Sequence, residues 1–362
     1  MNMSNKRNYG IDLLRILAMF MVVNLHVLGH GGVLGGVQLG SVRYMVAWFL
    51  EASTLCAVNV YALISGYVGG TSKFRFSRLL GLWLQVVFYT VLITFFYTIK
   101  NPEQITLSMW KNALFPICTK QYWYITGYFG LYLMLPFIRC IIDKITLKDA
   151  KIWGIILLVF FSIFPSVLQT DPFNIANGYS MLWLCTLYIV GACIKKYNFL
   201  SKWSHQRVVL LYCISVIFSW GSKLVLANFI PKNDEKSYEM MLMQYISPTI
   251  ILASIALLVL FARINFENKI LIRLVTIISP ATLGVYIIHE QFFIKTNIIT
   301  GISLPYAKAE NTIIMLFQII FMVLVVFCCC IFVEIIRLKL FRLLHIADKC
   351  RLIDEKIEKI FI

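Results

Sequence analysis

Four ionisable side chains lie in the first apolar stretch of the chain, GIDLLRILAMFMVVNLHVLGH, at Asp12, Arg15, His26 and His30. An ionisable residue at the centre of a bilayer costs about 3 kcal/mol on insertion scales, so such residues usually have a function. On a helix, the step from Arg15 to His26 covers three turns and about 20°, so both project from one face, about 16 Å apart along the axis. Asp12 lies three residues before Arg15, a spacing that permits an ion pair. The stretch therefore predicts a polar passage from a paired cation to an imidazole.

Each of these residues also has an ordinary interpretation. Arg15 is only a few residues from the start of the stretch, and its long side chain can reach lipid headgroups from there. His26 taken alone would more often be a bundle histidine bonded to a neighbouring carbonyl. The shared stripe favours the functional interpretation of the pair.

The amino-acid composition indicates whether the chain is surrounded by water or by lipid. Sixty per cent of the 362 residues are hydrophobic and only 14% are charged, whereas globular proteins are about half apolar and a quarter charged. This excludes a soluble globular domain and predicts a chain that lies mostly in lipid. The ten cysteines form no CxxC pair and have no ligand-like spacing with histidine. We therefore predict neither a disulfide framework nor a metal site.

Apolar stretches long enough to cross a bilayer as helices recur along the whole sequence. Continuous apolar runs differ from the weak alternating segments of a β-barrel, so the prediction is an all-α, polytopic membrane bundle. About ten transmembrane helices are expected, at 11–29, 46–68, 79–99, 122–142, 151–168, 179–194, 207–229, 244–262, 278–299 and 312–336.

The basic residues predict the orientation of these spans. Most of the 33 Lys and Arg fall in alternate loops, those on the side of the N-terminus, which the positive-inside rule assigns to the cytoplasm. Both termini are then cytoplasmic, and the net charge of +16 needs no nucleic acid as a partner. Charges interrupt the first apolar stretch, so we expect a retained span rather than a cleaved signal peptide. We expect one transmembrane domain over 1–342 and a short amphipathic cytoplasmic tail over 343–362.

Five stretches in order resemble the acyltransferase family 3 membrane proteins, and the resemblance extends over essentially the whole chain. The first holds the family signature, an arginine and then a histidine eleven positions later, at Arg15 and His26. The five stretches are LLRILAMFMVVNLHV, VNVYALISGYVGG, KFRFSRLLGLW, YWYITGYFGLYLMLPFI and ISPATLGVYIIHEQ.

The resemblance implies an integral membrane O-acyltransferase with His26 and Arg15 as its catalytic residues. Such enzymes move an acyl group, usually acetyl from cytoplasmic acetyl-CoA, to a hydroxyl of an extracytoplasmic glycan or lipid-linked sugar. Acyl-CoA is then a donor substrate, and no bound cofactor is expected. The expected partners are membrane lipid, the glycan acceptor and glycan-assembly proteins, and the expected location is the plasma membrane of a bacterium.

The basic stretch departs from the family in one respect, because Lys73, Arg75 and Arg78 stand without the adjacent arginines often found there. We predict that these three residues bind the CoA phosphates at the cytoplasmic mouth, since arginine matches phosphate bidentately. An ordinary positive-inside loop is the alternative.

The roles of the remaining candidates stay open in the sequence. His26 can act as a general base on the acceptor hydroxyl or as a nucleophile that forms an acyl-histidine. His289 can orient the acceptor, stabilise the oxyanion or make a buried structural hydrogen bond. Glu51 is close in depth to His26 and can orient its imidazole, or it can pair with Arg43. Asp12 is a candidate support through its pairing with Arg15.

A membrane transporter or glycan exporter is the alternative function. Ten spans and intramembrane charges also suit a carrier, but the sequence shows no convincing inverted repeat. The identities of the acyl group and of the acceptor glycan are not encoded in any pattern that we recognise.

Overall fold

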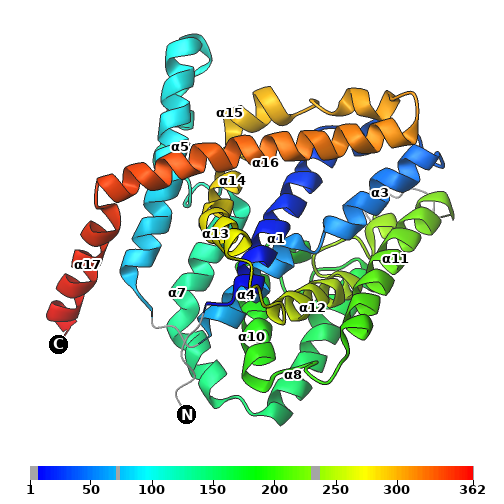
Figure 1. Cartoon of the computed structure of the whole chain (residues 1–362), viewed down its shortest axis with the longest axis horizontal. Helices are drawn as coiled ribbons and strands as arrows, with labels where there is room; N and C mark the ends of the chain where they lie inside the picture. The colour runs from blue at the N-terminus through cyan, green and yellow to red at the C-terminus, as the bar shows by residue number, and fades with distance from the viewer. Residues whose placement is uncertain (1–6, 71–73, 230–236, 362) are drawn as a thin grey trace.

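The computed structural model describes residues 7–70, 74–229 and 237–361, with side chains up to residue 357. These residues form helices and loops and no strand, which confirms the predicted all-α fold (Figure 1). The longer α-helices are α1 Tyr9–Leu28, α3 Val42–Thr54, α4 Ala57–Gly69, α5 Phe76–Lys100, α7 Trp123–Lys144, α8 Leu147–Leu158, α10 Met181–Tyr197, α11 His205–Phe229, α12 Pro248–Ala262, α13 Lys269–Ile278, α16 Thr312–Leu343 and α17 Ile346–Phe361. The shorter ones are α2 Val33–Gly36, α6 Leu107–Leu114, α9 Phe164–Leu168, α14 Thr282–His289 and α15 Phe292–Ile294.

Eight helical segments of the described chain are long and apolar enough to cross a membrane, which supports a multi-pass membrane protein. Seven of them coincide with expected spans, and the eighth, 269–289, overlaps the expected span 278–299 only over 278–289. The other two expected spans correspond to shorter helices, α10 with 17 residues and α12 with 15 residues. Part of the expected span 244–262 is not helical, because α12 begins only at Pro248 and the chain before it is irregular.

Helix α1 lies in the middle of the bundle (Figure 1). It packs against α3, α4, α12, α13, α14 and α16. In the segment Tyr9–Gly36, which contains α1, 67% of the most apolar 18 residues are buried inside the protein. In the segment Leu147–Leu168, which contains α8 and α9, the share is 17%. Since lipid can cover apolar side chains but cannot pair polar ones, the central helix is where ionisable residues can be satisfied by protein groups. This position explains why α1 carries them.

Small residues allow two of the helices around α1 to approach closely. A Cβ added at Gly66 in α4 would lie 1.9 Å from the carbonyl oxygen of Tyr188 in α10. The reciprocal contact is as close, because a Cβ at Gly191 would lie 2.1 Å from the oxygen of Leu63. Backbone contact of this kind is the usual basis of helix association in membranes.

The helical chain is interrupted at three places, and each interruption lies next to the central helix or to a cavity. The segment 42–69 breaks at Leu55 between α3 and α4. The segment 269–289 is broken by a 3₁₀ turn, η5 Ser279–Ala281, which contains Pro280. The irregular chain before α12 contains a second such turn, η4 Tyr238–Met240. Non-helical backbone at membrane depth is tolerated where it is buried in protein or lines a cavity.

The C-terminal part of the chain packs along one side of the bundle, as α16 and α17 show in Figure 1. Helix α17 occupies the tail that we expect to be amphipathic, and it contacts α5. Asp354 accepts hydrogen bonds from the backbone N–H of Ser77, at 2.8 Å, and from its hydroxyl. This contact ties the tail to the start of α5.

Candidate active site

The structure brings His26 and His289 into direct contact although 263 positions separate them. His26 lies near the end of α1 and His289 ends α14, a helix that packs against α1. Their nearest ring nitrogens, His26 Nδ1 and His289 Nε2, are 2.7 Å apart. His289 is also bonded through Nδ1 to the carbonyl oxygen of Val285, at 2.6 Å.

These contacts fix the tautomers of two neutral imidazoles. A carbonyl oxygen only accepts, so His289 Nδ1 carries the proton and its Nε2 carries the lone pair. His26 Nδ1 must then donate to His289, and His26 Nε2 is left with a lone pair. Within the described part of the chain, no hydrogen bond engages His26 Nε2. His26 therefore presents a base, and His289 holds it through Nε2 while its own Nδ1 is anchored to Val285.

A carboxylate lies beside this pair of rings. Glu290 follows His289 directly, and its Oε1 is 3.2 Å from His26 Nδ1 and 3.3 Å from His30 Nε2. Its second oxygen accepts from Lys295 Nζ at 3.1 Å. A partly buried carboxylate at this distance stabilises an imidazolium. Carboxylates stabilise the catalytic histidines of hydrolases in the same way. Sequence reasoning missed this role, although the pair His289–Glu290 was a usable signal.

Arg15 lies at the other end of the same face, as the helical spacing predicts, and its predicted ion pair with Asp12 is confirmed. Arg15 Nη1 donates to Asp12 Oδ1 at 2.7 Å. Asp12 is 3% exposed and accepts two further bonds, from Arg7 Nε at 2.5 Å and from Ser279 Oγ at 3.1 Å. Three donors satisfy this buried carboxylate, so it holds Arg15 firmly in place.

Two cavities lie in series along this face of α1. The first, of about 350 Å³, is lined by Arg15 together with Arg7, Asp12 and Tyr128. The second, of about 40 Å³, is lined by His26, with Tyr286 and Trp123 among its walls. Both are lined by Tyr61, Tyr124 and Leu283. The predicted polar passage therefore corresponds to two adjoining cavities with an aromatic wall between them.

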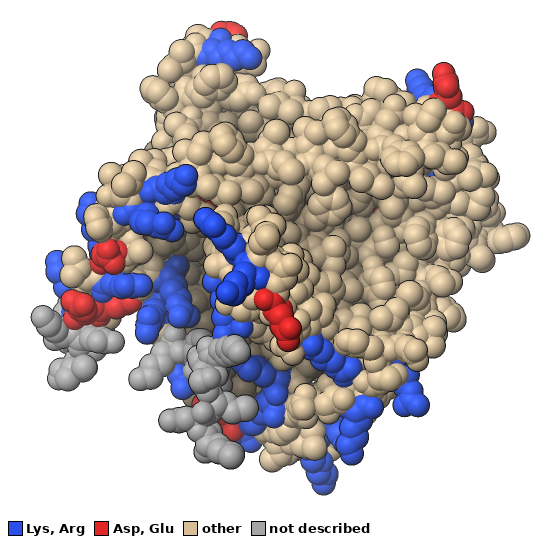
Figure 2. Space-filling view, in the orientation of Figure 1, with Lys and Arg blue, Asp and Glu red and all other residues tan. Residues whose placement is uncertain are grey.

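Basic side chains gather around a hollow near the two chain ends, on the lower left of Figure 2. Arg75 and Arg78 are both exposed at the start of α5, which the C-terminal helix α17 contacts. Neither residue lines the cavity of Arg15. Lys73 lies outside the described residues.

The carboxylate that contacts His26 is that of Glu290, and not that of Glu51. Within the described chain, Glu51 makes no hydrogen bond or ion pair with His26 or with Arg43, whose Nη1 donates to the carbonyl oxygen of Ala309 at 2.7 Å. One side-chain oxygen of Glu51, Oε2, is buried and has no hydrogen bond in the described part of the chain. The depth of a residue in the bundle does not determine which way its side chain points.

His26, His30 and Glu290 also form the kind of group that can bind a metal ion. One ligand atom from each lies within 4.8 Å of the others, and two imidazoles with a carboxylate suit Zn²⁺. Two contacts compete with that use. His26 Nδ1 already faces His289 at 2.7 Å, and Lys295 occupies the second oxygen of Glu290. The contacts present are those of a proton-handling network.

A membrane bundle with a buried base and a cation at the two ends of one passage suits group transfer between substrates that approach from different sides. Comparison with protein families identifies the class. The Acyltransferase domain of acyltransferase family 3 matches residues 8–334, nearly the whole chain. The chain therefore belongs to this family and is a membrane acyltransferase, and the transporter alternative gains no support. Comparisons with curated proteins and with solved structures give no match.

Proposed function

We propose that this protein is an O-acyltransferase that moves an acyl group, most simply acetyl, from cytoplasmic acyl-CoA to a hydroxyl of a surface polysaccharide or lipid-linked glycan. The observation that carries the proposal is the pair of adjoining cavities along α1, with Arg15 in one and His26 in the other. A cation and a base about 16 Å apart match a donor that has an anionic head and a reactive end on a long arm.

The donor would enter at the end where the basic residues gather. Arg15 and Arg7 line a cavity of about 350 Å³, and their guanidinium groups can bind phosphate oxygens in forked pairs. Arg75 and Arg78 would bind the remaining phosphates at the mouth, and Lys73 keeps the role predicted from the sequence. The pantetheine arm would then run past Tyr61 and Tyr124 and bring the thioester to His26.

The reaction needs a base and then an acid, and one histidine can be both. His26 Nε2 removes the proton of the acceptor hydroxyl while the oxygen attacks the thioester carbonyl carbon. The resulting imidazolium is stabilised by Glu290 at 3.2 Å. When the tetrahedral intermediate collapses, the C–S bond breaks and His26 returns its proton to the thiolate. The products are the acylated glycan and free CoA.

We assign His26 the role of general base, and the same free nitrogen would also serve an acyl-histidine nucleophile. His26 Nδ1–H is directed to His289, so the ring is held by one nitrogen and works with the other. His289 acts through His26, because both of its nitrogens have partners within the protein. Of the roles that the sequence left open for His289, the buried structural hydrogen bond is the one that these contacts support, and through it His289 positions His26.

The glycan acceptor, a plasma-membrane location in a bacterium and cooperation with glycan-assembly proteins complete the proposal. Support comes from the family, and from the lipid-facing composition, which suits an enzyme that works on membrane-linked substrates.

The proposal is tested by comparing the O-acyl groups of surface glycans, by NMR, between a deletion strain and strains restored with wild-type protein or with His26→Ala. Wild-type protein should restore the acyl signal and His26→Ala should not, although both insert in the membrane at equal levels. Gln104→Ala, an exposed position in the turn Pro102–Gln104, is the matched control and should restore the signal in full. Normal acylation with His26→Ala would contradict the proposal.

A further inference from the structure

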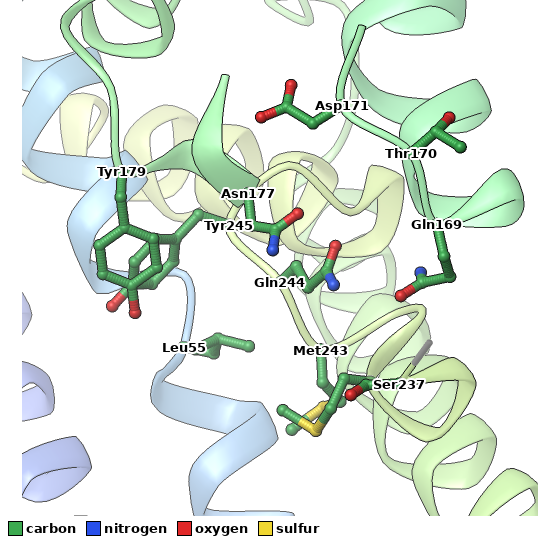
Figure 3. A pocket seen from close by; sticks show the side chains of 11 residues that line it. Leu55, Gln169, Thr170, Asp171, Asn177, Tyr179, Ser237, Met243, Gln244 and Tyr245 are labelled. Atoms are coloured by element: carbon green, nitrogen blue, oxygen red, sulfur yellow. The ribbon is translucent and has the colours of Figure 1, made fainter. Parts of the chain in front are cut away.

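A third cavity, of about 450 Å³, adjoins the cavity of His26 (Figure 3). Its walls come from the loop that follows α9 and from the irregular segment that precedes α12. Tyr245 lines both this cavity and the cavity of His26. A ligand seated in the third cavity can therefore extend a group past Tyr245 to the base. We call it the amide cavity, after Gln169, Asn177 and Gln244 in its walls.

We infer that the amide cavity is the acceptor subsite and that it selects an uncharged sugar residue rather than a uronic acid or a phosphorylated sugar. This inference rests on the proposed function and adds to it the site and the charge class of the acceptor.

The walls of the amide cavity combine aromatic rings with side-chain amides. Tyr179 and Tyr245 lie with their ring centroids 4.9 Å apart, and Trp123 lies 4.4 Å from Tyr179. Figure 3 shows the two tyrosine rings on one side of the cavity and the amide groups of Asn177 and Gln244 next to them. Aromatic faces beside adaptable amide donors and acceptors suit a ring that carries several hydroxyls.

One wall residue of the amide cavity, Gln244, has a hydrogen-bond acceptor without a partner. The side-chain oxygen Oε1 of Gln244 is buried and has no hydrogen bond in the described part of the chain. A buried polar atom without a partner costs roughly 1–3 kcal/mol, which a ligand can recover. Because this atom only accepts, the group that satisfies it must be a donor, as a hydroxyl is.

The described walls of the amide cavity carry no positive charge. Among the described residues that line the cavity there is no Lys or Arg, and the one charged side chain is Asp171. Lys223 reaches Met240 in the wall, but it is ion-paired with Glu239 at 3.1 Å. Among the described wall residues, an anionic sugar would meet the carboxylate of Asp171 and no Lys or Arg.

The cavity is also built to keep its shape. Both carboxylate oxygens of Asp171 accept backbone N–H bonds from its own loop, at 2.7 Å from Ile175 and 2.6 Å from Ala176. Asn59 donates to the carbonyl oxygen of Tyr245 at 2.7 Å and so fixes the opposite wall. Gly178 has a φ of +98°, and a Cβ there would lie 2.5 Å from the Cβ of Tyr245, so the two walls meet closely.

The charge class is tested by locating the acyl group. NMR of purified surface glycan from wild-type and deletion strains should show that the acyl group lost on deletion sits on an uncharged sugar residue. An acyl group on a uronic acid or on a phosphate-bearing sugar would overturn the inference and leave the proposed function standing. Identical glycans in the two strains would instead contradict the proposed function itself.

The site is tested with Gln244→Ala and Asn177→Ala in host membranes that contain the native glycan, with [¹⁴C]acetyl-CoA as the donor. Each variant should lower label transfer about ten-fold, whereas the thermal stabilisation that CoA gives to the purified variant should stay unchanged and shows that it is folded. Gln104→Ala should transfer at the wild-type rate. Transfer within about two-fold of wild type in both cavity variants would exclude the amide cavity as the acceptor site.

Gln244→Lys separates charge from shape. With an uncharged acceptor, the lysine variant should lose as much transfer as Gln244→Ala. Faster transfer by Gln244→Lys than by the wild-type protein would mean that the acceptor carries a negative charge, and it would overturn the inference.

Discussion

The cavity of Arg15 and the amide cavity each share wall residues with the cavity of His26, and they differ in charge. The first is lined by two arginines and a buried aspartate, and the second by amides, a carboxylate and tyrosines. The first therefore suits a polyanionic ligand, whereas the second suits an uncharged, hydroxylated one. A difference in charge between two cavities can therefore hold two substrates in separate sites that meet only at His26. Substitutions in either cavity or at His26 should have different effects on the two substrates.

The largest effect is expected at the centre, where both substrates meet. Glu290→Gln keeps the size of the side chain but removes the charge that lies 3.2 Å from His26 Nδ1. Transfer should fall about 10,000-fold in kcat, as for the triad histidine of serine proteases when its carboxylate is replaced by an amide. Single-turnover assays with [¹⁴C]acetyl-CoA measure this step directly. A loss confined to the KM of acetyl-CoA would show that Glu290 serves donor binding instead.

The next effect falls on the donor side. Arg15→Ala removes a cation from the first cavity and leaves Asp12 with two of its three donors. The affinity for CoA should drop about 100-fold, since each hydrogen bond to a charged group contributes roughly 1.5–3 kcal/mol. Isothermal titration with CoA measures the loss. Arg43→Ala, whose side chain bonds to the carbonyl of Ala309 away from both cavities, is the control and should bind normally. Equal losses in the two variants would remove the special role of Arg15.

A smaller effect is expected at Asp12, because it acts through its neighbours. Asp12→Asn keeps an acceptor for Ser279 but weakens the hold on Arg7 and Arg15. CoA affinity should fall about ten-fold, with kcat at saturating donor unchanged. A fall in kcat without a change in affinity would place Asp12 in the chemical step rather than in the donor site.

These residues also show how far the sequence alone could predict the molecule. The stripe of Asp12, Arg15 and His26 follows from the 3.6-residue period, because all three lie within one helix. The fold class followed from composition and from the length of the apolar runs. Such features are local, and the structure agrees with them.

The partners of His26 were not predictable in the same way. Glu290 reaches it only because α14 packs on α1, and the Pro280 turn sets where α14 begins. The amide cavity depends on a span that is partly irregular, although its sequence is as apolar as a helix. Nonlocal packing decides both, and hydropathy contains no information about which faces of two helices meet.

The smallest effect is expected from metal removal. His26, His30 and Glu290 could bind a divalent ion, but the bond from His26 to His289 and the ion pair with Lys295 already engage the same groups. Prolonged dialysis of purified enzyme against EDTA should therefore leave the transfer rate unchanged. Loss of activity on dialysis and its recovery with Zn²⁺ would mean that these three residues form a metal centre rather than a proton-handling network.

The central claim is that donor and acceptor reach His26 from opposite sides of the membrane. It is tested most directly in sealed vesicles of known orientation, with [¹⁴C]acetyl-CoA, which does not cross the bilayer, added outside. We predict that label enters glycan in inside-out vesicles, where the N-terminal side and the Arg15 cavity face the added donor, and not in right-side-out vesicles. Equal labelling in intact right-side-out vesicles would contradict the account.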